Sequence, residues 1–283
     1  TSFLLKRNTK MNKIFIETKI VVEGSLNLKN LSQVNNSDFN INELKKIKVL
    51  YKNKEKNLSE IFKIKIEKNK QNFNEIFLKK TNSNFEYIGY KWSNDTLHVN
   101  SDIGSYVATK MESGNIIVSG SVEDYAGAEM KGGFLLIKKN AGKFLAASLP
   151  GKKMGMNGGE VFILGNVTDY LCYEMRRGLV FVGGKSGDYS CNNLIAGTVI
   201  IGRISGRNFG SSIKRGTIIV LSKIKLESHF SETSNSSNSF LKLIENYIQT
   251  ILKKRIFKSK HIFLRSLGDT RVEGKGEIFS LKP

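Results

Sequence analysis

The feature that most constrains this chain is a repeat of 19 residues built around glycine. A long apolar residue, two residues of any type, a glycine, one further residue and a three-residue apolar run recur in that order six times. The anchor glycines of the six copies are Gly114, Gly133, Gly159, Gly178, Gly197 and Gly216. The long interval between the second and third anchors equals one period plus a seven-residue insertion near residues 150–156.

A unit of this kind holds one short strand and must turn corners within about a dozen residues, where glycine supplies positive φ. Such a unit cannot bury its own apolar face, so the copies must stack on one another. One period before Gly114, Trp92 and the run 96–99 form a degenerate first copy. We therefore predict a mainly β protein containing a right-handed parallel β-helix of about seven 19-residue coils. Propeller blades need about 40 residues, and sandwich strands do not recur at a constant interval.

The composition divides the chain into three segments. Of the 26 glycines, 21 lie between residues 91 and 220. We predict a small α+β cap over 1–90, the β-helix over 91–222, and a C-terminal helix with a closing strand over 223–283. Apolar residues at helical spacing place that helix at 240–252. The Ser- and Asn-rich run 234–239 is expected to be a linker, and a Gly turn within 271–279 to lead into the last strand.

The charge is strongly positive but diffuse. The chain has 45 Lys and Arg against 25 Asp and Glu, a net charge of +20, and each predicted segment carries part of the excess. Abundant Lys and Asn are typical of an AT-rich genome, so we predict no nucleic-acid partner, although diffuse charge favours anionic ligands. The sequence contains no run of 18 apolar residues, so we predict no membrane span. The first ten residues do not resemble a secretory signal, and two cysteines are too few for a disulfide scaffold. The expected compartment is the cytoplasm, with Met11 an alternative start.

Few residues suggest catalysis. His98, His229 and His261 form no recognisable metal-ligand motif. Cys172 and Cys191 lie one period apart, at a position that is otherwise Gly or Ala in the other copies. This indicates small buried side chains that pack in the core rather than nucleophiles. The Gly-rich run 183–187 lacks the spacing of a phosphate-binding loop. We expect no catalytic residue, metal ligand or bound cofactor in this chain.

Basic residues recur just before the anchor glycines, and stacking would align them as one ridge. The ridge and the insertion together comprise Lys131, Lys152, Lys153, Arg176, Arg177, Lys214 and Arg215. One interpretation of this pattern is that the basic side chains lie at a corner of the coils and are solvated. The other is a docking ridge for an acidic partner or polyanionic ligand.

The repeat resembles the Gly-x-Gly-x-Gly β-helix superfamily, which includes the last domain of the glutamate synthase large subunit and the C subunit of formylmethanofuran dehydrogenase. The whole chain is more similar to the second of these, and most of all to its bacterial version, the C subunit of the formyltransferase/hydrolase complex. The resemblance rests on the insertion at 150–159, the runs 175–178, 194–202 and 214–220, and the closing run 274–278.

This resemblance implies a non-catalytic subunit in one-carbon metabolism. Its partners would be a formyltransferase subunit, a zinc-bearing hydrolase subunit and a dehydrogenase-like subunit. Formyl groups would pass from formyl-tetrahydromethanopterin to a methanofuran-like carrier, whose glutamate-rich tail could contact the basic ridge. The alternatives are the C subunit of a molybdenum or tungsten formylmethanofuran dehydrogenase, a glutamate-synthase-like structural protein, and an independent polyanion-binding module.

Overall fold

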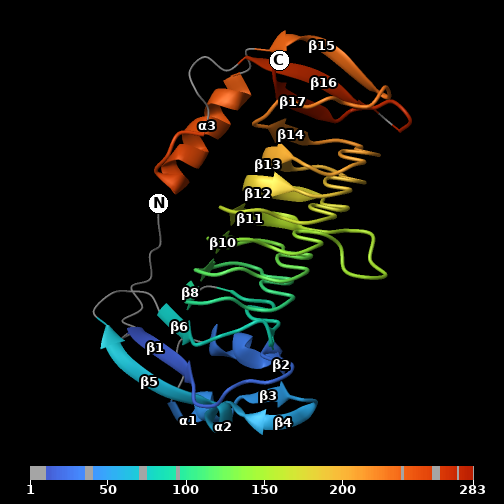
Figure 1. The fold of residues 1–283 in the computed structure, drawn as a ribbon. Helices are drawn as coiled ribbons and strands as arrows, with labels where there is room; N and C mark the ends of the chain where they lie inside the picture. The colour runs from blue at the N-terminus through green and yellow to red at the C-terminus, as the bar shows by residue number, and fades with distance from the viewer. Residues whose placement is uncertain are drawn as a thin grey trace, which may run out of the picture.

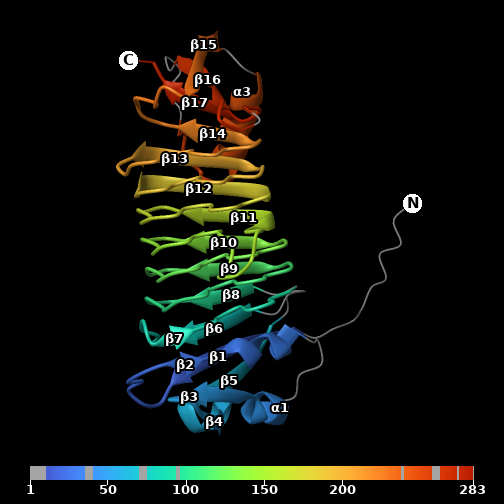
Figure 2. The same cartoon turned by 90° about the vertical axis from the view of Figure 1, so that its right-hand side faces the viewer.

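The chain folds mainly into β-strands. The computed structural model describes residues 11–35, 41–69, 75–93, 96–236, 239–256, 262–272 and 274–282. Two mixed sheets, one of 13 strands and one of four, contain the strands of these residues. The strands stack along one axis, with the N-terminal segment at one end and the C-terminal segment at the other (Figures 1 and 2). The mainly β class predicted from the sequence is confirmed.

Each copy of the repeat contributes one strand to the large sheet. These strands are β8 (Thr96–Val99), β9 (Asn115–Val118), β10 (Phe134–Ile137), β11 (Asn157–Ile163), β12 (Arg177–Ser186), β13 (Thr198–Ile204) and β14 (Thr217–Val220). Neighbours pair in parallel, with Ile116 opposite Leu135 and Leu135 opposite Val161. The insertion precedes β11, so the longer interval does not break the register. The Gly-rich run 183–187 lies almost wholly within β12 and forms no phosphate loop.

The interior of the stack is filled by residues from equivalent positions of successive copies. The strand residues Ile116, Leu135 and Val161 are fully buried. Isolated parallel bridges join Ile103, Val122, Ala141 and Val167 in turn, so a second column of apolar residues pairs from copy to copy. The anchor glycines have φ between +80° and +111°. A Cβ at most of them would approach the carbonyl oxygen of the preceding anchor to about 3 Å. The repeat glycine is therefore required by both backbone conformation and close approach.

Two further columns stabilise the corners. Six aromatic rings stack face to face, with neighbouring centroids 4.5–5.2 Å apart. They are Tyr87, Tyr106, Tyr125, Phe144, Tyr170 and Tyr189. Asp and Asn side chains accept hydrogen bonds from the backbone of the next copy, as where the Ser121 N–H donates to Asp102 Oδ1 at 2.7 Å. Each copy thus satisfies backbone donors of its neighbour.

The N-terminal segment continues the large sheet and adds the small one. Its elements are β1 (Met11–Thr18), β2 (Leu26–Asn27), a 3₁₀ helix (Lys29–Asn35), α1 (Ile41–Lys46), β3 (Lys48–Tyr51), β4 (Lys54–Asn57), α2 (Leu58–Ile61), β5 (Phe62–Asn69), β6 (Glu75–Lys79) and β7 (Phe85–Glu86). Strand β6 pairs in parallel with β8 and with β1, and β5 forms the edge. The large sheet therefore runs across the predicted boundary at residue 90. Lysines along the edge strand β5 disfavour pairing with another chain.

The C-terminal segment caps the other end. It contains β15 (Phe230–Ser236), α3 (Ser239–Leu252), β16 (Phe263–Asp269) and β17 (Glu277–Leu281). The predicted helix and closing strand are confirmed. The predicted linker at 234–239 is wrong at 234–236, because β15 extends to Ser236 and pairs with β16, and at 239, where α3 begins; 237 and 238 lie outside the described residues. Pairing with a neighbouring strand offsets the weak intrinsic strand preference of Ser and Asn. Figure 1 shows α3 lying along the side of the stacked strands rather than over their end.

Candidate functional site: a basic cleft on the repeat ridge

The basic side chains predicted to form a ridge lie where each copy approaches its anchor glycine. Arg176 and Arg177 precede Gly178, and Lys214 and Arg215 precede Gly216. All seven predicted residues are exposed. The side chains point outward because the apolar residue before each pair is fully buried and anchors the chain in the core, as Met175 and Ile213 do.

Five of the seven residues line one cleft of about 450 Å³. Its walls are formed by Lys153, Met154, Arg176, Arg177, Ile195, Ala196, Lys214 and Arg215. The copy between the two charged copies contributes Ile195 and Ala196, whose smaller, uncharged side chains leave room between the cations. On the insertion side, Arg176 Nη1 lies 3.4 Å from the sulfur of Met154. The insertion therefore forms a wall of the cleft, which we call the basic cleft.

The other two predicted residues lie apart from it. Lys131 Nζ lies 3.0 Å from Oε1 of Glu112 in the preceding copy, so its charge is already balanced by an exposed carboxylate. Lys152 does not line the cleft, although it neighbours Lys153. The basic cleft thus combines Lys153 of the insertion with the two charged pairs at 176–177 and 214–215.

The chemistry of the basic cleft suits an anion with more than one charged group. Within the part of the chain that the structure describes, Lys153, Arg176 and Lys214 have no carboxylate at ion-pair distance. Guanidinium groups bind carboxylates and phosphates through paired hydrogen bonds. The two charged copies flank an uncharged one, so their cations are separated by two intervals of about 4.8 Å. An extended chain that carries carboxylates about 10 Å apart would contact both pairs of cations.

The histidines and cysteines of the described residues lie in different environments. His98 stacks on Phe77 with ring centroids 4.7 Å apart, and His261 lies outside the described residues. Cys172 and Cys191 are free and fully buried, and burial raises the pKa of the Cys172 thiol. The described residues include no group of three or more His, Cys, Asp or Glu able to hold a metal ion. The prediction that both cysteines are buried fillers is confirmed.

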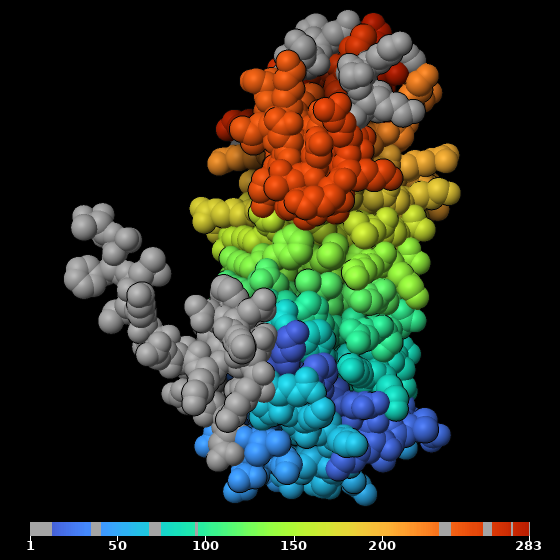
Figure 3. All heavy atoms as spheres, turned by 90° about the vertical axis from the view of Figure 1, so that its left-hand side faces the viewer, coloured from blue at the N-terminus to red at the C-terminus, as the bar shows by residue number. Residues whose placement is uncertain are grey.

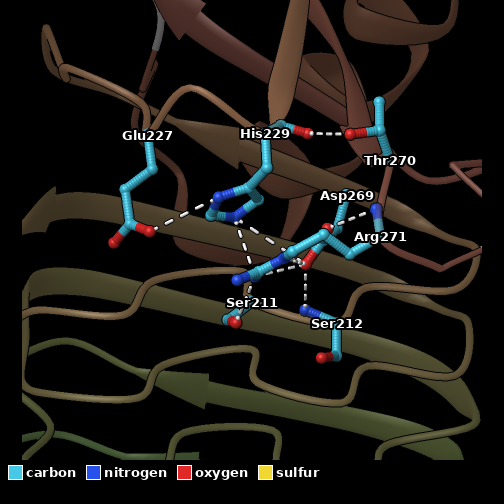
Figure 4. Close-up of polar contacts among 7 residues, drawn as sticks. All are labelled: Ser211, Ser212, Glu227, His229, Asp269, Thr270 and Arg271. Carbon is cyan, nitrogen blue, oxygen red and sulfur yellow. Dashed lines mark hydrogen bonds and ion pairs between the residues drawn. The ribbon is translucent and has the colours of Figure 1, made fainter.

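A polar cluster that the sequence did not predict closes the C-terminal end of the stack (Figure 4). The carboxylate of Asp269 is fully buried and accepts hydrogen bonds from the side chain of Arg271 and from the Ser212 N–H. Arg271 Nη2 also lies 3.0 Å from His229 Nε2, which must be unprotonated to accept this hydrogen bond. Glu227 lies 3.5 Å from the other ring nitrogen of His229.

This cluster is a structural clamp. Hydrogen bonds from Arg271 hold the pKa of the Asp269 carboxyl well below its usual range. Asp269 is the last residue of β16, which forms the closing hairpin with β17, and Ser212 directly precedes the last copy of the repeat. The carboxylate therefore joins this hairpin to the stack. Arg271 lies two residues after Asp269, but Ser212 lies 57 residues before Asp269 and His229 lies 42 residues before Arg271. No local pattern connects these distant partners.

Comparison with known proteins identifies related folds. The model of a family described as GXGXG motif matches residues 38–263. No curated protein matches the chain. Among solved structures, the chain is similar to one from the X-ray crystal structure of the formyltransferase/hydrolase complex from Methylorubrum extorquens in complex with methylofuran. The two are 24% identical with a TM-score of 0.86, and the match covers 95% of this chain and 100% of that chain. This likeness shows a shared fold along almost the whole chain.

Proposed function

The chain belongs to the GXGXG motif family, and from this premise we propose that it is the non-catalytic C subunit of a formyltransferase/hydrolase complex. One observation carries the proposal: the likeness to a chain of such a complex spans that chain from end to end. The cap, the stack and the closing hairpin thus correspond together, rather than the repeat alone. We further propose that the stacked copies form a right-handed parallel β-helix of about seven coils.

The proposed role is to hold other subunits in place. In such a complex, formyl groups would pass from formyl-tetrahydromethanopterin to a methanofuran-like carrier and be released as formate in the cytoplasm. We assign the zinc to a separate hydrolase subunit. This chain would contribute a rigid surface, because each copy is fixed to its neighbours by strand pairing, stacked rings and buried apolar columns.

The basic cleft supports a contact with the carrier's acidic tail. Its cations and the uncharged gap between them fit an extended chain of carboxylates, as described above. The carrier supplies the group to which formyl is attached. The residues of the cleft would only bind and orient its tail, through charge and hydrogen bonds.

Purification of the tagged chain from its native host tests the proposal. We expect a formyltransferase and a zinc hydrolase to co-purify in fixed proportion to the chain. Co-purification with a molybdenum or tungsten dehydrogenase would favour the oxidative complex instead. Recovery of the chain alone, or with the subunits of a glutamate synthase, would contradict the proposal.

A further inference from the structure

The outer face of the large sheet carries a column of residues that are apolar in all positions but one. Its ten members lie opposite one another on successive strands from β1 to β17. They are Phe15, Phe77, His98, Ile117, Leu136, Phe162, Phe181, Ile200, Ile219 and Phe279. Nine of these ten are apolar, although outward positions of a solvated sheet are usually polar. A face of this composition is suited to being covered.

Helix α3 covers only half of the column. Phe162, Phe181, Ile200, Ile219 and Phe279 are at most 3% exposed and cluster with the apolar side of α3. The remaining members are half-buried, and the last of them packs against the edge of this cluster: Phe15, Phe77, His98, Ile117 and Leu136. We call these five residues the open half. In Figure 3, α3 lies over the C-terminal copies and ends before the earlier ones.

The lengths explain why half remains open. At about 1.5 Å per residue, the 14 residues of α3 span about 21 Å. Ten strands spaced by about 4.8 Å span about 43 Å. The open half is therefore about as long as a second helix of 14 residues. In the described part of the chain, the other α-helices are α1 and α2, of six and four residues, which contact each other and the N-terminal strands.

The borders of the open half indicate the charge of its partner. On one side lie the uncharged Thr96 and Asn115 and an ion pair of Lys13 with Glu75 at 3.4 Å. On the other side lie Asn100, Ser119 and Glu17, whose charge is balanced by Lys80 at 2.8 Å. Two lysines extend that second border. Lys79 Nζ lies 4.8 Å from the centre of the Phe15 ring, and exposed Lys138 follows Ile137 of β10. An apolar strip with a polar border matches the apolar core and polar rim of a protein interface. The two lysines outside these ion pairs favour acidic residues on the partner.

We propose that the open half binds an amphipathic helix of another subunit, with an apolar stripe and acidic residues beside it. The helix would continue the interface that α3 makes with the same column. The identity of the partner as a subunit rests on the proposed function, whereas the location of the interface rests on the column alone.

Photo-cross-linking in the native host tests this inference. Benzoylphenylalanine replaces Ile117 or Leu136, and in a matched control it replaces Leu243, which is 65% exposed on the outer side of α3. We expect positions 117 and 136 to be joined to a single helical segment of another subunit, and position 243 not to be joined to it. Attachment to residues of this same chain, to a second copy, or to nothing would overturn the inference.

A paired substitution provides the functional readout. Ile117→Asp with Leu136→Asp should lower the amount of retained partner more than tenfold, while Leu243→Asp leaves it unchanged. The thermal midpoint of each variant separates lost binding from lost folding, and unchanged partner retention in a folded double variant would contradict the inference. If the wild type retains no formyltransferase or hydrolase, the proposed function fails. If it retains both without a cross-link at 117 or 136, this inference alone fails.

Discussion

Replacing an anchor glycine should cost more than replacing a glycine that has the same kind of backbone but open surroundings. Gly178 has φ of +111°, and a Cβ there would lie 2.7 Å from the carbonyl oxygen of Gly159. Gly151, in the insertion, has φ of +77° with nothing within 4 Å of an added Cβ. Both substitutions incur the conformational strain of alanine, about 1–2 kcal/mol, but only Gly178→Ala adds overpacking of about 1–3 kcal/mol.

The free energy of unfolding should therefore fall by about 2–5 kcal/mol for Gly178→Ala and by no more than about 2 kcal/mol for Gly151→Ala. Urea unfolding followed by Trp92 fluorescence measures both, because Trp92 is the single tryptophan and is fully buried. Circular dichroism in parallel reports whether the stack unfolds together with the Trp92 site. Equal losses in the two variants would refute the argument that contact between neighbouring copies requires glycine.

Individual sites give three further predictions. Asp269→Asn should lower the free energy of unfolding at pH 7 by about 1–3 kcal/mol. Because the folded-state pKa of Asp269 lies below its usual range, the difference in unfolding free energy between wild type and variant should narrow as the pH falls below about 4. A difference that does not change with pH in urea titrations would contradict this. Cys172 and Cys191 should resist thiol reagents in the native protein and react in urea, and rapid native labelling would show that the thiols are accessible. Reversing the four charges contributed to the basic cleft by the two copies should lower retention of a polyglutamate-bearing carrier about tenfold without changing the thermal midpoint, whereas unchanged retention and assembly would remove the cleft from the proposal.

The repeat was predictable because its cause is local. Each anchor glycine answers a steric requirement that recurs every 19 residues, so the period and the strand positions can be read from the sequence. The strand at Thr96–Val99 was predicted in the same way, although Asp95, at the anchor position before it, lies outside the described residues. The helix at Ser239–Leu252 followed from its apolar spacing.

Other features depend on contacts that the sequence shows only weakly or not at all. Five of the six stacked rings lie 11 residues after an anchor position, from residue 95 to Gly178, so a search of every column would have found them. The strand at 230–236 depends on its pairing with β16, which overrides the weak strand preference of its Ser and Asn residues. The Asp269 clamp joins the local pair Asp269 and Arg271 to Ser212 and His229, which are distant in the chain. For the ridge, the sequence predicted that the basic side chains line up from copy to copy. It could not show that the carboxylate of Glu112 forms an ion pair with Lys131.

The most direct test of the central claim is formyl turnover by the purified chain alone, measured beside the purified complex. The account holds that this chain supplies shape and binding surfaces but no reacting group. It predicts that the complex releases formate from formyl-tetrahydromethanopterin in the presence of the carrier, and that the chain alone releases none above the buffer rate. Formate release by the chain alone, rising in proportion to its concentration, would contradict the account.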